Sequence, residues 1–500
     1  MVYLVGAGPG DPGLITVKAL DLLRRADIVL YDRLVDATLL SETKPGCTII
    51  DVGKSAGNHI KTQDEIISML AEYGRKGYEV VRLKGGDPFL FGRGGEEAEH
   101  LNREGIPFAM VPGVSAFTSV PAYAGIPLTH RNYASSVGVA TGHGAKGKGH
   151  DPVRWRLLAR AVDTIVVFMG VGALETITGE LLAGGLSGET PSALIEQGST
   201  PVQRVITGTL ATIAEDAKKE RINPPALLVV GKVAAHVNIL QWYDPGPLAG
   251  LRIGITRPLG QSVSFSGALR SYGALPFLMP TIKTVDTIDT TEINKVMNRV
   301  SHYDYIVFSS TNGVESFFKA LKKYNCDTRS LGGVKIASIG PVTARALSTH
   351  GINSDITAEK FIAEGLFESL FKQGHIEGLR FLLVRSDKGR EILYKRLLDE
   401  GAEVDQAAFY STQPAELTPY MVDTIKSGYI DIITFTSSST VESFFNQIPP
   451  DELNDTVKIA SIGPQTTEML MRYQKSPDIE ASEYTTAGLA IAILDTCVQQ

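Results

Sequence analysis

The sequence predicts an α/β protein, with a two-lobed N-terminal half and a C-terminal half built from a duplicated α/β unit. Apolar runs of strand length alternate with amphipathic stretches along the 500 residues. The segment QWYDPGPLAG, residues 241–250, has the proline and glycine content of a linker. Beyond it, similar segments recur at offsets of about 123 to 128 residues. Because solenoid repeats are only ~20–50 residues long, this period indicates a duplicated domain.

The composition of the chain indicates which kinds of binding partner are unfavourable. Apolar residues make up 43% of the chain, charged residues 21%, and the formal net charge is −7, which argues against a nucleic acid or an anionic membrane. No apolar run reaches the ~18–20 residues of a membrane span, and the N-terminus lacks a signal pattern. Cys47, Cys326 and Cys497 are far apart, which predicts no disulfide framework and no cysteine metal cluster. We therefore expect a cytoplasmic protein with small-molecule ligands and no metal site.

The first glycine loop is GPGDPG, Gly8–Gly13, which matches the dinucleotide pattern G-x-G-x-x-G. It follows an apolar strand, and Asp32 ends the next one, near the position of a ribose-binding acid. However, Pro9 and Pro12 lack the N–H donors that a pyrophosphate needs. A nucleotide site, a tight structural turn and a site for another ligand all remain open from these residues alone.

Two further elements of the first half carry candidate ligand contacts. In VVRLKGGDPFLFGRGGEE, residues 80–97, Gly85, Gly86 and Asp87 follow a strand, at the end where open α/β sheets bind ligands. The glycines would let a ligand approach the backbone, and the alternative is a capped turn. In VPGVSAF, residues 111–117, Ser115 and Ala116 begin a predicted helix, and the alternative is an ordinary N-cap.

The duplicated half repeats strand ends followed by helix starts. VKIASIGP occurs at 334–341 and 457–464, FSSTNGVESFF at 308–318 resembles FTSSSTVESFF at 435–445, and GLRIGITR at 250–257 resembles GLRFLLVR at 378–385. Asn312 with Glu315, and Ser439 with Glu442, have the spacing of capping boxes. Helix starts of this kind also offer donors to carboxylates.

Residues 1–245 resemble the uroporphyrinogen-III C-methyltransferases of the tetrapyrrole methylase family. The matching stretches, in order, are VGAGPGDPGLITVKAL, YDRLV, VGKSAGNHIKTQDEI, VVRLKGGDPFLFGRGGEEAEHL, VPGVSAFTSVPAYAGIPLTHR, VFMGVG and PALLVVGKV. The resemblance implies transfer of two methyl groups from S-adenosylmethionine to carbons of uroporphyrinogen III, giving precorrin-2 for siroheme, cobalamin or both. It also implies a two-lobed fold with the cofactor between the lobes, and a homodimer formed through this half.

The same resemblance assigns roles to individual positions. The family's proton-transfer groups fall on Asp32 and Lys54. Its cofactor contacts fall on ten positions, namely Pro9, Gly85, Gly86, Asp87, Leu90, Ser115, Ala116, Met169, Gly198 and Ala226. An octacarboxylate substrate calls for basic side chains, because arginine binds carboxylates through two hydrogen bonds. The candidates beside these motifs are Arg33, Arg82, Arg93, Arg131 and His130.

Residues 250–500 resemble the uroporphyrinogen-III synthases. The matching stretches are GITRP, FSSTNGVESFF, SIGPVTARAL, LVRSDKGREIL, GAEVDQAAFYST, FTSSSTVESFF and SIGPQTTEML. The resemblance implies closure of linear hydroxymethylbilane with inversion of ring D and loss of water, without a metal or organic cofactor. It implies two lobes joined by a two-strand hinge, one formed by 250–282 with 412–500 and the other by 284–410.

Six residues carry over to the synthase site, with Tyr410 as the expected acid for the departing hydroxyl. Packing beside a hinge strand is the alternative for Tyr410. Thr343 and Thr466, at the two IGP turns, are the next candidates. Weaker candidates are Ser310, Ser437 and Lys458.

Two other classes of function stay open. A nicotinamide-dependent oxidoreductase would use the first glycine loop, although its prolines count against this. A ligand-sensing module would use two hinged lobes to capture a tetrapyrrole without turnover. The two halves leave no segment of comparable length for a dehydrogenase and ferrochelatase portion, so we expect neither NAD nor iron insertion.

Overall fold

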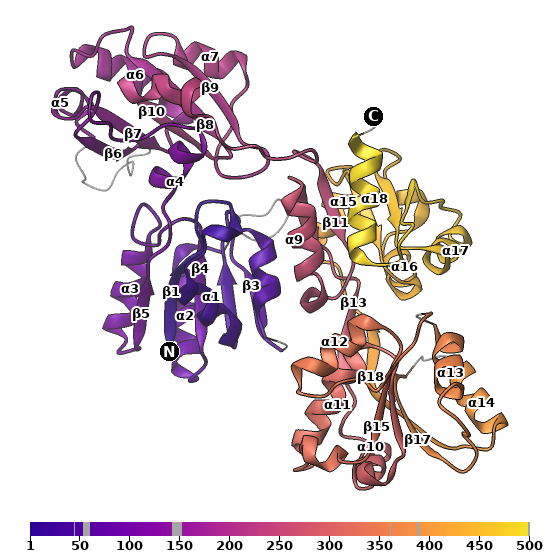
Figure 1. Ribbon diagram of the computed structural model, residues 1–500. Coiled ribbons are helices and arrows are strands. Elements are labelled where there is room, and N and C mark those ends of the chain that lie inside the picture. Colours follow the sequence, from indigo (N-terminus) through magenta and orange to yellow (C-terminus); the bar gives the residue numbers. More distant parts are fainter. Residues whose placement is uncertain (45, 54–60, 143–152, 361, 388–390, 499–500) are drawn as a thin grey trace. The chain divides into compact units, whose positions relative to one another are not determined.

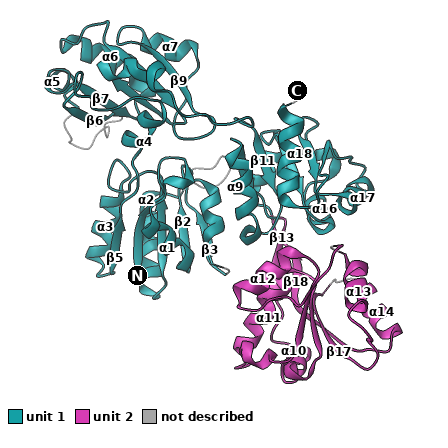
Figure 2. Ribbon diagram, in the orientation of Figure 1, with its two compact units in different colours: residues 1–280, 417–500 teal, residues 281–416 magenta. Residues whose placement is uncertain are grey.

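The computed structural model describes residues 1–500 except 45, 54–60, 143–152, 361, 388–390 and 499–500 (Figure 1). It forms two compact units, one of Met1–Pro280 with Leu417–Gln500 and the other of Thr281–Glu416 (Figure 2). Four β-sheets with helices on both faces make up these units. The predicted α/β class is confirmed.

The first sheet is fully parallel, with strand order β3-β2-β4-β1-β5. Its strands are β1 (Val2–Gly6), β2 (Ile28–Tyr31), β3 (Thr48–Asp51), β4 (Val80–Lys84) and β5 (Phe108–Val111). Helix α1 (Val17–Arg25) packs on one face, and α2 (Gln63–Arg75) and α3 (Gly94–Arg103) pack on the other. All five carboxyl ends therefore meet at one edge, where the loops after β1, β2 and β4 gather.

The second sheet is mixed, with strand order β6-β7-β10-β8-β9. Its strands are β6 (Val137–Thr141), β7 (Thr164–Phe168), β8 (Pro191–Glu196), β9 (Arg204–Thr209) and β10 (Ala226–Val230). Only β6 and β7 pair in parallel. One face is covered by α5 (Trp155–Ala161), α6 (Leu174–Ala183) and α7 (Ile213–Lys219), and the other by α4 (Ala116–Tyr123) and α8 (Val237–Leu240).

The third sheet is fully parallel, with strand order β12-β11-β19-β20-β21. Its strands are β11 (Arg252–Ile255), β12 (Leu275–Leu278), β19 (Ile432–Phe435), β20 (Lys458–Ser461) and β21 (Ile479–Glu480). Helices α9 (Val263–Ser271) and α18 (Thr486–Val498) cover one face. The other face packs against α15 (Pro419–Lys426), α16 (Ser438–Phe445) and α17 (Pro464–Arg472).

The fourth sheet forms the second unit, with strand order β13-β18-β17-β14-β15-β16. Its strands are β13 (Ile282–Asp286), β14 (Tyr305–Phe308), β15 (Lys335–Ser338), β16 (Ile356–Thr357), β17 (Arg380–Ser386) and β18 (Glu403–Pro414). Only β13 runs antiparallel to its neighbour, β18. Helices α10 (Thr291–Met297), α11 (Thr311–Lys323) and α12 (Pro341–Thr349) pack on one face, and α13 (Ala363–Phe371) and α14 (Ile392–Asp399) on the other.

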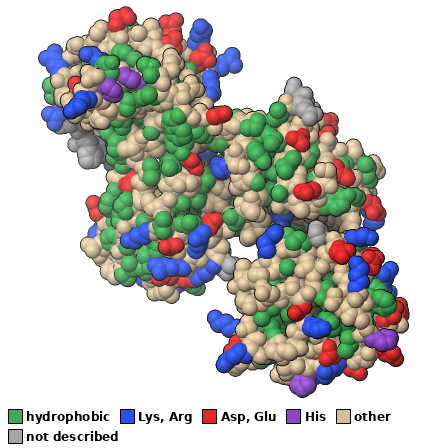
Figure 3. Space-filling model, in the orientation of Figure 1, with side chains coloured by type: hydrophobic (Ala, Val, Ile, Leu, Met, Phe, Trp, Pro, Cys, Tyr) green, Lys and Arg blue, Asp and Glu red, His purple; other side chains and the backbone are tan. Residues whose placement is uncertain are grey.

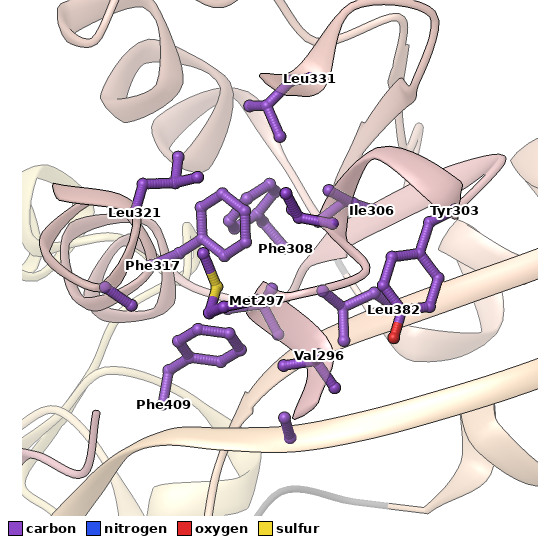
Figure 4. Packing of buried hydrophobic residues seen from close by; sticks show 14 of the residues in the cluster. Val296, Met297, Tyr303, Ile306, Phe308, Phe317, Leu321, Leu331, Leu382 and Phe409 are labelled. Atoms are coloured by element: carbon purple, nitrogen blue, oxygen red, sulfur yellow. The ribbon is translucent and has the colours of Figure 1, made fainter. Parts of the chain in front are cut away.

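An aromatic cluster fills the larger core of this second unit. Phe308 of β14, Phe317 of α11 and Phe409 of β18 are each 0% exposed and pack against Met297 and Leu382 (Figure 4). The Phe308 and Phe317 rings meet edge to face, with centroids 5.2 Å apart. The core thus ties strands from both copies of the duplication to one helix layer.

The duplicated copies exchange their first strands between the two sheets. The sequence echo of 250–257 and 378–385 corresponds to β11 and β17, and that of 308–318 and 435–445 to the starts of α11 and α16. β11 of the first copy pairs with β19 of the second, whereas β17 of the second copy pairs with β14 of the first. Each sheet is therefore built from both copies.

The predicted capping boxes at Asn312 and Ser439 are wrong by two residues. Ser310 caps α11 by accepting from Gly313 N, and Ser437 caps α16 within a capping box completed by Thr440. Both serines are extended, with φ of −166° and −167°, so their hydroxyls reach the N3 amide. Asn312 and Ser439 lie in the first turns of these helices.

Several expectations about composition can be compared with the fold. Acidic and basic side chains are interspersed on the face seen in Figure 3. Among the described residues, no helix has the length and apolarity to cross a membrane. The three cysteines are free thiols.

Candidate active sites

Close contacts between glycines join three segments of the N-terminal half. A Cβ on Gly113 would lie 2.3 Å from the Gly86 carbonyl oxygen, and one on Gly6 would lie 2.5 Å from Gly113 Cα. Gly8 and Gly86 exchange backbone hydrogen bonds of 3.3 and 2.6 Å. Any side chain at Gly6 or Gly113 would force these segments apart. The three segments that the sequence singled out are thereby brought together at the carboxyl edge of the first sheet.

Asp87 fixes this junction through its side chain. Its Oδ1 accepts from Phe89 N at 2.8 Å and its Oδ2 accepts from Gly113 N at 3.0 Å. Ser115 caps α4, accepting from Phe117 N, and Ala116 is the first residue of that helix. Gly86, with φ of +66°, faces the start of this helix, since a Cβ on it would meet only Ala116 N, at 3.9 Å. Gly86 therefore leaves open space beside the helix start.

The second lobe contributes a turn that touches the first glycine loop. A Cβ on Gly10, beside Pro9, would lie 2.8 Å from Thr200 Cγ2 and 3.2 Å from Gly198 O. Ala226 begins β10 and pairs with Glu196, immediately before this turn. Near the end of β7, Phe168 packs against Phe91, with centroids 5.1 Å apart, which places Met169 beside the loop that follows Leu90.

Left-handed backbone conformations gather in these same loops. Five non-glycine residues of the N-terminal half with positive φ follow β4, β7 or β8: Phe91, Arg93, Met169, Gln197 and Ser199. The Ser199 hydroxyl is buried and has no hydrogen-bond partner among the described residues. Strained backbone and orphaned polar atoms are concentrated at functional sites. All ten predicted cofactor positions lie in or beside these loops, and their role stays a prediction.

Asp32 belongs to a group of four charged side chains, of which the other three are buried. Arg82 Nη2 lies 2.5 Å from Asp32 Oδ1, and Arg82 Nε lies 3.3 Å from Glu97 Oε1. Lys84 Nζ lies 3.0 Å from the same Glu97 oxygen and 3.9 Å from Asp32 Oδ2. The side chains of Arg82, Lys84 and Glu97 are 2%, 4% and 0% exposed, whereas Asp32 is 30% exposed. Asp32 is thus the member of the group that reaches solvent.

The electrostatics of this group are balanced but not fully hydrogen-bonded. Two cations face two carboxylates. Burial and the adjacent Arg82 guanidinium lower the pKa of Lys84, against the opposing effect of Glu97 and Asp32. Glu97 Oε1 also accepts from Gln63, while Glu97 Oε2 has no hydrogen-bond partner among the described residues. Neither Lys84 nor Glu97 was predicted as a site residue.

The expectation that Arg82 lines a cleft for substrate carboxylates is wrong, because its guanidinium is buried against Asp32 and Glu97 and donates to the Leu30 and Leu83 carbonyls. Arg33, Arg93 and Arg131 are exposed. Arg93 pairs with Glu96 at 2.6 Å, and His130 packs against Tyr133 and His236. Lys54, the predicted partner of Asp32, lies outside the described residues.

The first glycine loop is not built like a dinucleotide loop. Pro12 opens a 3-10 turn, Pro12–Leu14, capped by Asp11, and α1 begins only at Val17 with Thr16 as its N-cap. The helix that would face a pyrophosphate is therefore separated from the glycines by a turn. This geometry disfavours the nicotinamide interpretation.

In the second unit, Tyr410 and Ser310 form the central contact of the predicted synthase residues. Their hydroxyl oxygens are 2.8 Å apart. Ser310 follows β14 and caps α11, and Tyr410 lies in β18, where it pairs with Asp286 of β13. Tyr410 is 7% exposed. Its environment is therefore both packed and hydrogen-bonded, so the two sequence-based alternatives for Tyr410 are compatible.

The other predicted synthase residues divide by location. Thr343 and Thr466 occupy the first turns of α12 and α17, each after a proline at the helix start, and are 4% and 3% exposed. Ser437 caps α16 at the carboxyl end of β19. Lys458 is the first residue of β20, so it lies at the amino ends of the parallel strands, opposite the carboxyl ends that carry Ser437 and Thr466. The structure therefore places Lys458 away from Ser437 and Thr466.

Comparisons with known proteins divide the chain in the same way. Residues 1–214 match the family described as Tetrapyrrole (Corrin/Porphyrin) Methylases, and residues 263–491 match Uroporphyrinogen-III synthase HemD. The Porphyrin biosynthesis protein HemD of Ruminiclostridium josui is 35% identical over 477 residues, covering 94% of this chain and 93% of that protein. The Uroporphyrinogen-III C-methyltransferase of Synechocystis sp. is 49% identical over 245 residues, covering 49% of this chain and 93% of that protein.

Among solved structures, Uroporphyrin-III C-methyl transferase from Thermus thermophilus complexed with S-adenyl homocysteine is 43% identical, with a TM-score of 0.40. The match covers 46% of this chain and 92% of that one.

Two successive pairs of α/β lobes, the first joined through glycine loops and the second built from exchanged copies, define a fusion of two enzymes. The family matches fall on these two parts. The chain belongs to the tetrapyrrole methylases in its N-terminal half and to the uroporphyrinogen-III synthases in its C-terminal half, as the resemblance predicted.

Proposed function

We propose that the N-terminal half methylates uroporphyrinogen III twice to precorrin-2 and that the C-terminal half forms uroporphyrinogen III from hydroxymethylbilane. The observation that carries the first activity is the junction of three glycine segments beside the partly exposed Asp32. Family membership supports both activities. The product would feed the siroheme pathway, the cobalamin pathway or both.

The residues at the junction fit S-adenosylmethionine. Gly86 and Ala116 leave space against the backbone, and the buried Ser199 hydroxyl has no partner among the described residues, so it is available to a polar ligand atom. When bound, the cofactor supplies a methyl group on a positively charged sulfur. Pro9, Gly85 and Leu90 would add small or apolar contacts. No phosphate cradle is needed for such a ligand, which accounts for prolines in the first loop.

Asp32 is suited to accept the proton that a macrocycle carbon loses when it gains a methyl group. Each transfer forms one C–C bond, breaks the S–CH₃ bond and releases one proton. Arg82 Nη2 holds Asp32 Oδ1 at 2.5 Å, whereas Asp32 Oδ2 lies 3.9 Å from Lys84 Nζ. Lys54, which the resemblance pairs with Asp32, would complete the proton transfer.

Exposed apolar side chains beside the junction suit the pyrrole rings of the macrocycle. Leu34, Phe89, Phe91 and Met169 are 40–59% exposed. Leu34 also contacts the glycine loop, since a Cβ on Gly85 would lie 3.0 Å from Leu34 Cβ. Burying these surfaces under the substrate would contribute roughly 25 cal/mol per Å² of apolar area.

For the synthase reaction, Tyr410 is the group we assign as proton donor to the departing hydroxyl. The C–O bond breaks, and water leaves with the donated proton. To invert ring D, the freed carbon bonds to the α-carbon of that ring that already carries a bridging methylene. The bond from that methylene then breaks and re-forms at the other α-carbon, which loses its proton. Ser310, 2.8 Å away, orients the phenol. Thr343 and Thr466 support the helix starts that would bind substrate carboxylates.

The methyltransferase assignment is tested with uroporphyrinogen III and S-adenosylmethionine under anaerobic conditions. Mass spectrometry should show a product with two added methyl groups. Asp32→Asn should lower the rate by about 100-fold or more, within the range of general base catalysis. Asp21→Asn, on the exposed side of α1, is the matched control and should keep the wild-type rate. An unmethylated substrate with the wild-type protein would refute the assignment.

We further propose that the chain forms a homodimer through the methyltransferase half. The support is the resemblance alone. Sedimentation velocity of the full chain tests it, and a mass close to 53.8 kDa across a range of concentrations would contradict it.

A further inference from the structure

Arg257 lies just after the carboxyl end of β11, a central strand of the third sheet. It lies two residues beyond the end of β11, after the buried Thr256. From β11 the chain passes through α9 to β12 on one side, whereas from β19 it passes through α16 to β20 on the other. The strand order therefore reverses between β11 and β19. In open parallel sheets, ligands bind outside the carboxyl ends of the strands at this reversal.

The guanidinium of Arg257 is partly buried, and it has no carboxylate beside it in the part of the chain that the structure describes. Its Nη2 donates a hydrogen bond to Gln261 Oε1 at 3.2 Å. Its Nε is buried and has no hydrogen-bond partner in the part of the chain that the structure describes, and no Asp or Glu there lies within ion-pair distance of it. Burial lowers the pKa of Arg257. A buried, unpaired cation is costly unless it binds an anion.

The surroundings of Arg257 also favour an anion. Helix α9 begins at Val263, and its N-cap, Ser262, makes no side-chain capping bond. The hydroxyl of Ser266, in the second turn, is buried and lacks a hydrogen-bond partner among the described residues. At the neighbouring strand end, Ser437 caps α16. The starts of α9 and α16 thus both follow strand ends on the side of the sheet where Arg257 lies, and a 3-10 turn, Leu259–Gln261, separates Arg257 from α9.

The duplication offers an internal comparison. Arg385 is the sequence counterpart of Arg257 and lies near the end of β17 in the second unit. Arg385 Nη1 donates to Gln406 Oε1 at 2.5 Å, and Nε donates to Ser386 O at 3.2 Å. The Nε of Arg385 thus has an acceptor within its own lobe, whereas that of Arg257 has none among the described residues. Of these two arginines, Arg257 is the one with a guanidinium nitrogen that lacks a partner among the described residues.

We propose that Arg257 binds a carboxylate of the linear tetrapyrrole in the synthase half and anchors the substrate at the reversal between β11 and β19. This inference rests on the proposed synthase function. A side-chain carboxylate of the substrate supplies the anion, since guanidinium and carboxylate form paired, charge-assisted hydrogen bonds. Arg257 is therefore a substrate-binding residue for an anionic bilane in a protein whose net charge is −7.

Variants of the full chain test this with kinetics and stability together. Arg257→Met keeps the approximate volume and removes the charge, Arg257→Lys keeps the charge, and Arg472→Gln changes an exposed arginine of α17 in the same lobe. With hydroxymethylbilane as substrate, Arg257→Met should raise KM at least 10-fold with a smaller change in kcat. Arg257→Lys should recover part of the loss, and Arg472→Gln should match wild type.

Stability separates binding from a structural role. Removing a partly buried cation that has no carboxylate partner among the described residues should leave the Tm of Arg257→Met at or above the wild-type Tm. A lower Tm together with lost activity would make Arg257 structural and overturn the proposal, as would an unchanged KM. Methyl transfer to uroporphyrinogen III by the same variants should stay at the wild-type rate, which reports that the chain is folded. If wild type itself forms no type III isomer, the synthase function fails, and binding of uroporphyrin III to wild type and Arg257→Met by fluorescence still decides whether Arg257 binds a carboxylated tetrapyrrole.

Discussion

Lys84 Nζ and Glu97 Oε1 lie 3.0 Å apart in the interior of the first lobe, with side chains only 4% and 0% exposed. The strand β4 carries Lys84, and α3 carries Glu97. Arg82 links this pair to Asp32, the proposed proton acceptor. Glu97 therefore acts through other side chains, as a positioning residue for Asp32.

Replacing Glu97 by glutamine should lower both stability and the rate of methyl transfer. The change leaves two buried cations with one carboxylate, and breaking a buried ion pair costs about 3–5 kcal/mol. Without its ion pair to Glu97, Arg82 should move and shift Asp32. This should change the pH dependence of the rate of methyl transfer as well as the maximal rate. Urea unfolding and the pH–rate profile check this. Glu99→Gln, exposed on the same helix, is the control and should stay within about 0.5 kcal/mol of wild type. An unaltered pH–rate profile in Glu97→Gln would contradict the positioning role.

Lys84 should make the first lobe more stable as pH rises in the alkaline range. Its pKa is lowered in the folded state, so above that pKa the native protein has lost a proton that the unfolded chain keeps up to about pH 10.4. Since the unfolded state binds more protons in this window, the contribution of Lys84 to the free energy of unfolding rises with pH there. Urea midpoints of the first lobe, followed by hydrogen exchange in β4, should show this rise in wild type and a smaller one in Lys84→Met. If the stability of wild type and of Lys84→Met changed equally with pH, Lys84 would not be the source of the rise.

Gly113→Ala should abolish tight binding of the cofactor. The new Cβ would lie 2.3 Å from the Gly86 carbonyl oxygen and push the loops that contain Gly86 and Gly113 apart. We expect the affinity for S-adenosylhomocysteine, measured by calorimetry, to fall at least 10-fold. Gly179→Ala in α6 is the matched control, because its Cβ would meet no atom within 4 Å. Equal affinities in the two variants would refute the placement of the cofactor.

Tyr410→Phe should slow the synthase reaction without abolishing it. The variant keeps the ring in its packed position and removes the hydroxyl that contacts Ser310. Folding of the bilane into a closing conformation supplies much of the rate and is retained, so we expect a loss of about 10- to 1000-fold. Formation of the type III isomer measures this, with Tyr420→Phe, exposed on α15, as the control. A rate equal to wild type would leave Tyr410 with a packing role only.

Much of the fold was predictable because its strands are apolar runs that end in glycine or hydroxyl residues. Glycine patterns also located the loops after β1, β4 and β5, since Gly6 and Gly113 are required by close backbone contacts and Gly86 by its positive φ. The exchange of β11 and β17 between sheets was not predictable from the repeat, because each copy by itself reads as a complete α/β unit. It followed only from the resemblance to a family.

The buried charges were missed for a physical reason. In GGEEAEHL, Glu96 and Glu97 read alike, yet Glu97 is 0% exposed because it shares a helix face with the buried Leu101. Its spacing of four residues from Leu101 was the available signal. Likewise, Arg82 and Lys84 in VVRLK look like a strand facing solvent, but β4 is a central strand covered on both faces, so both cations must pair. The roles of the predicted site residues stay predictions.

The most direct test supplies the full chain with hydroxymethylbilane, with and without S-adenosylmethionine, and identifies the products by chromatography and mass. Two active halves predict uroporphyrinogen III without the methyl donor, and its dimethylated derivative when the donor is present. Only the type I isomer, which forms spontaneously, in both reactions would contradict the assignment of two consecutive activities to this chain.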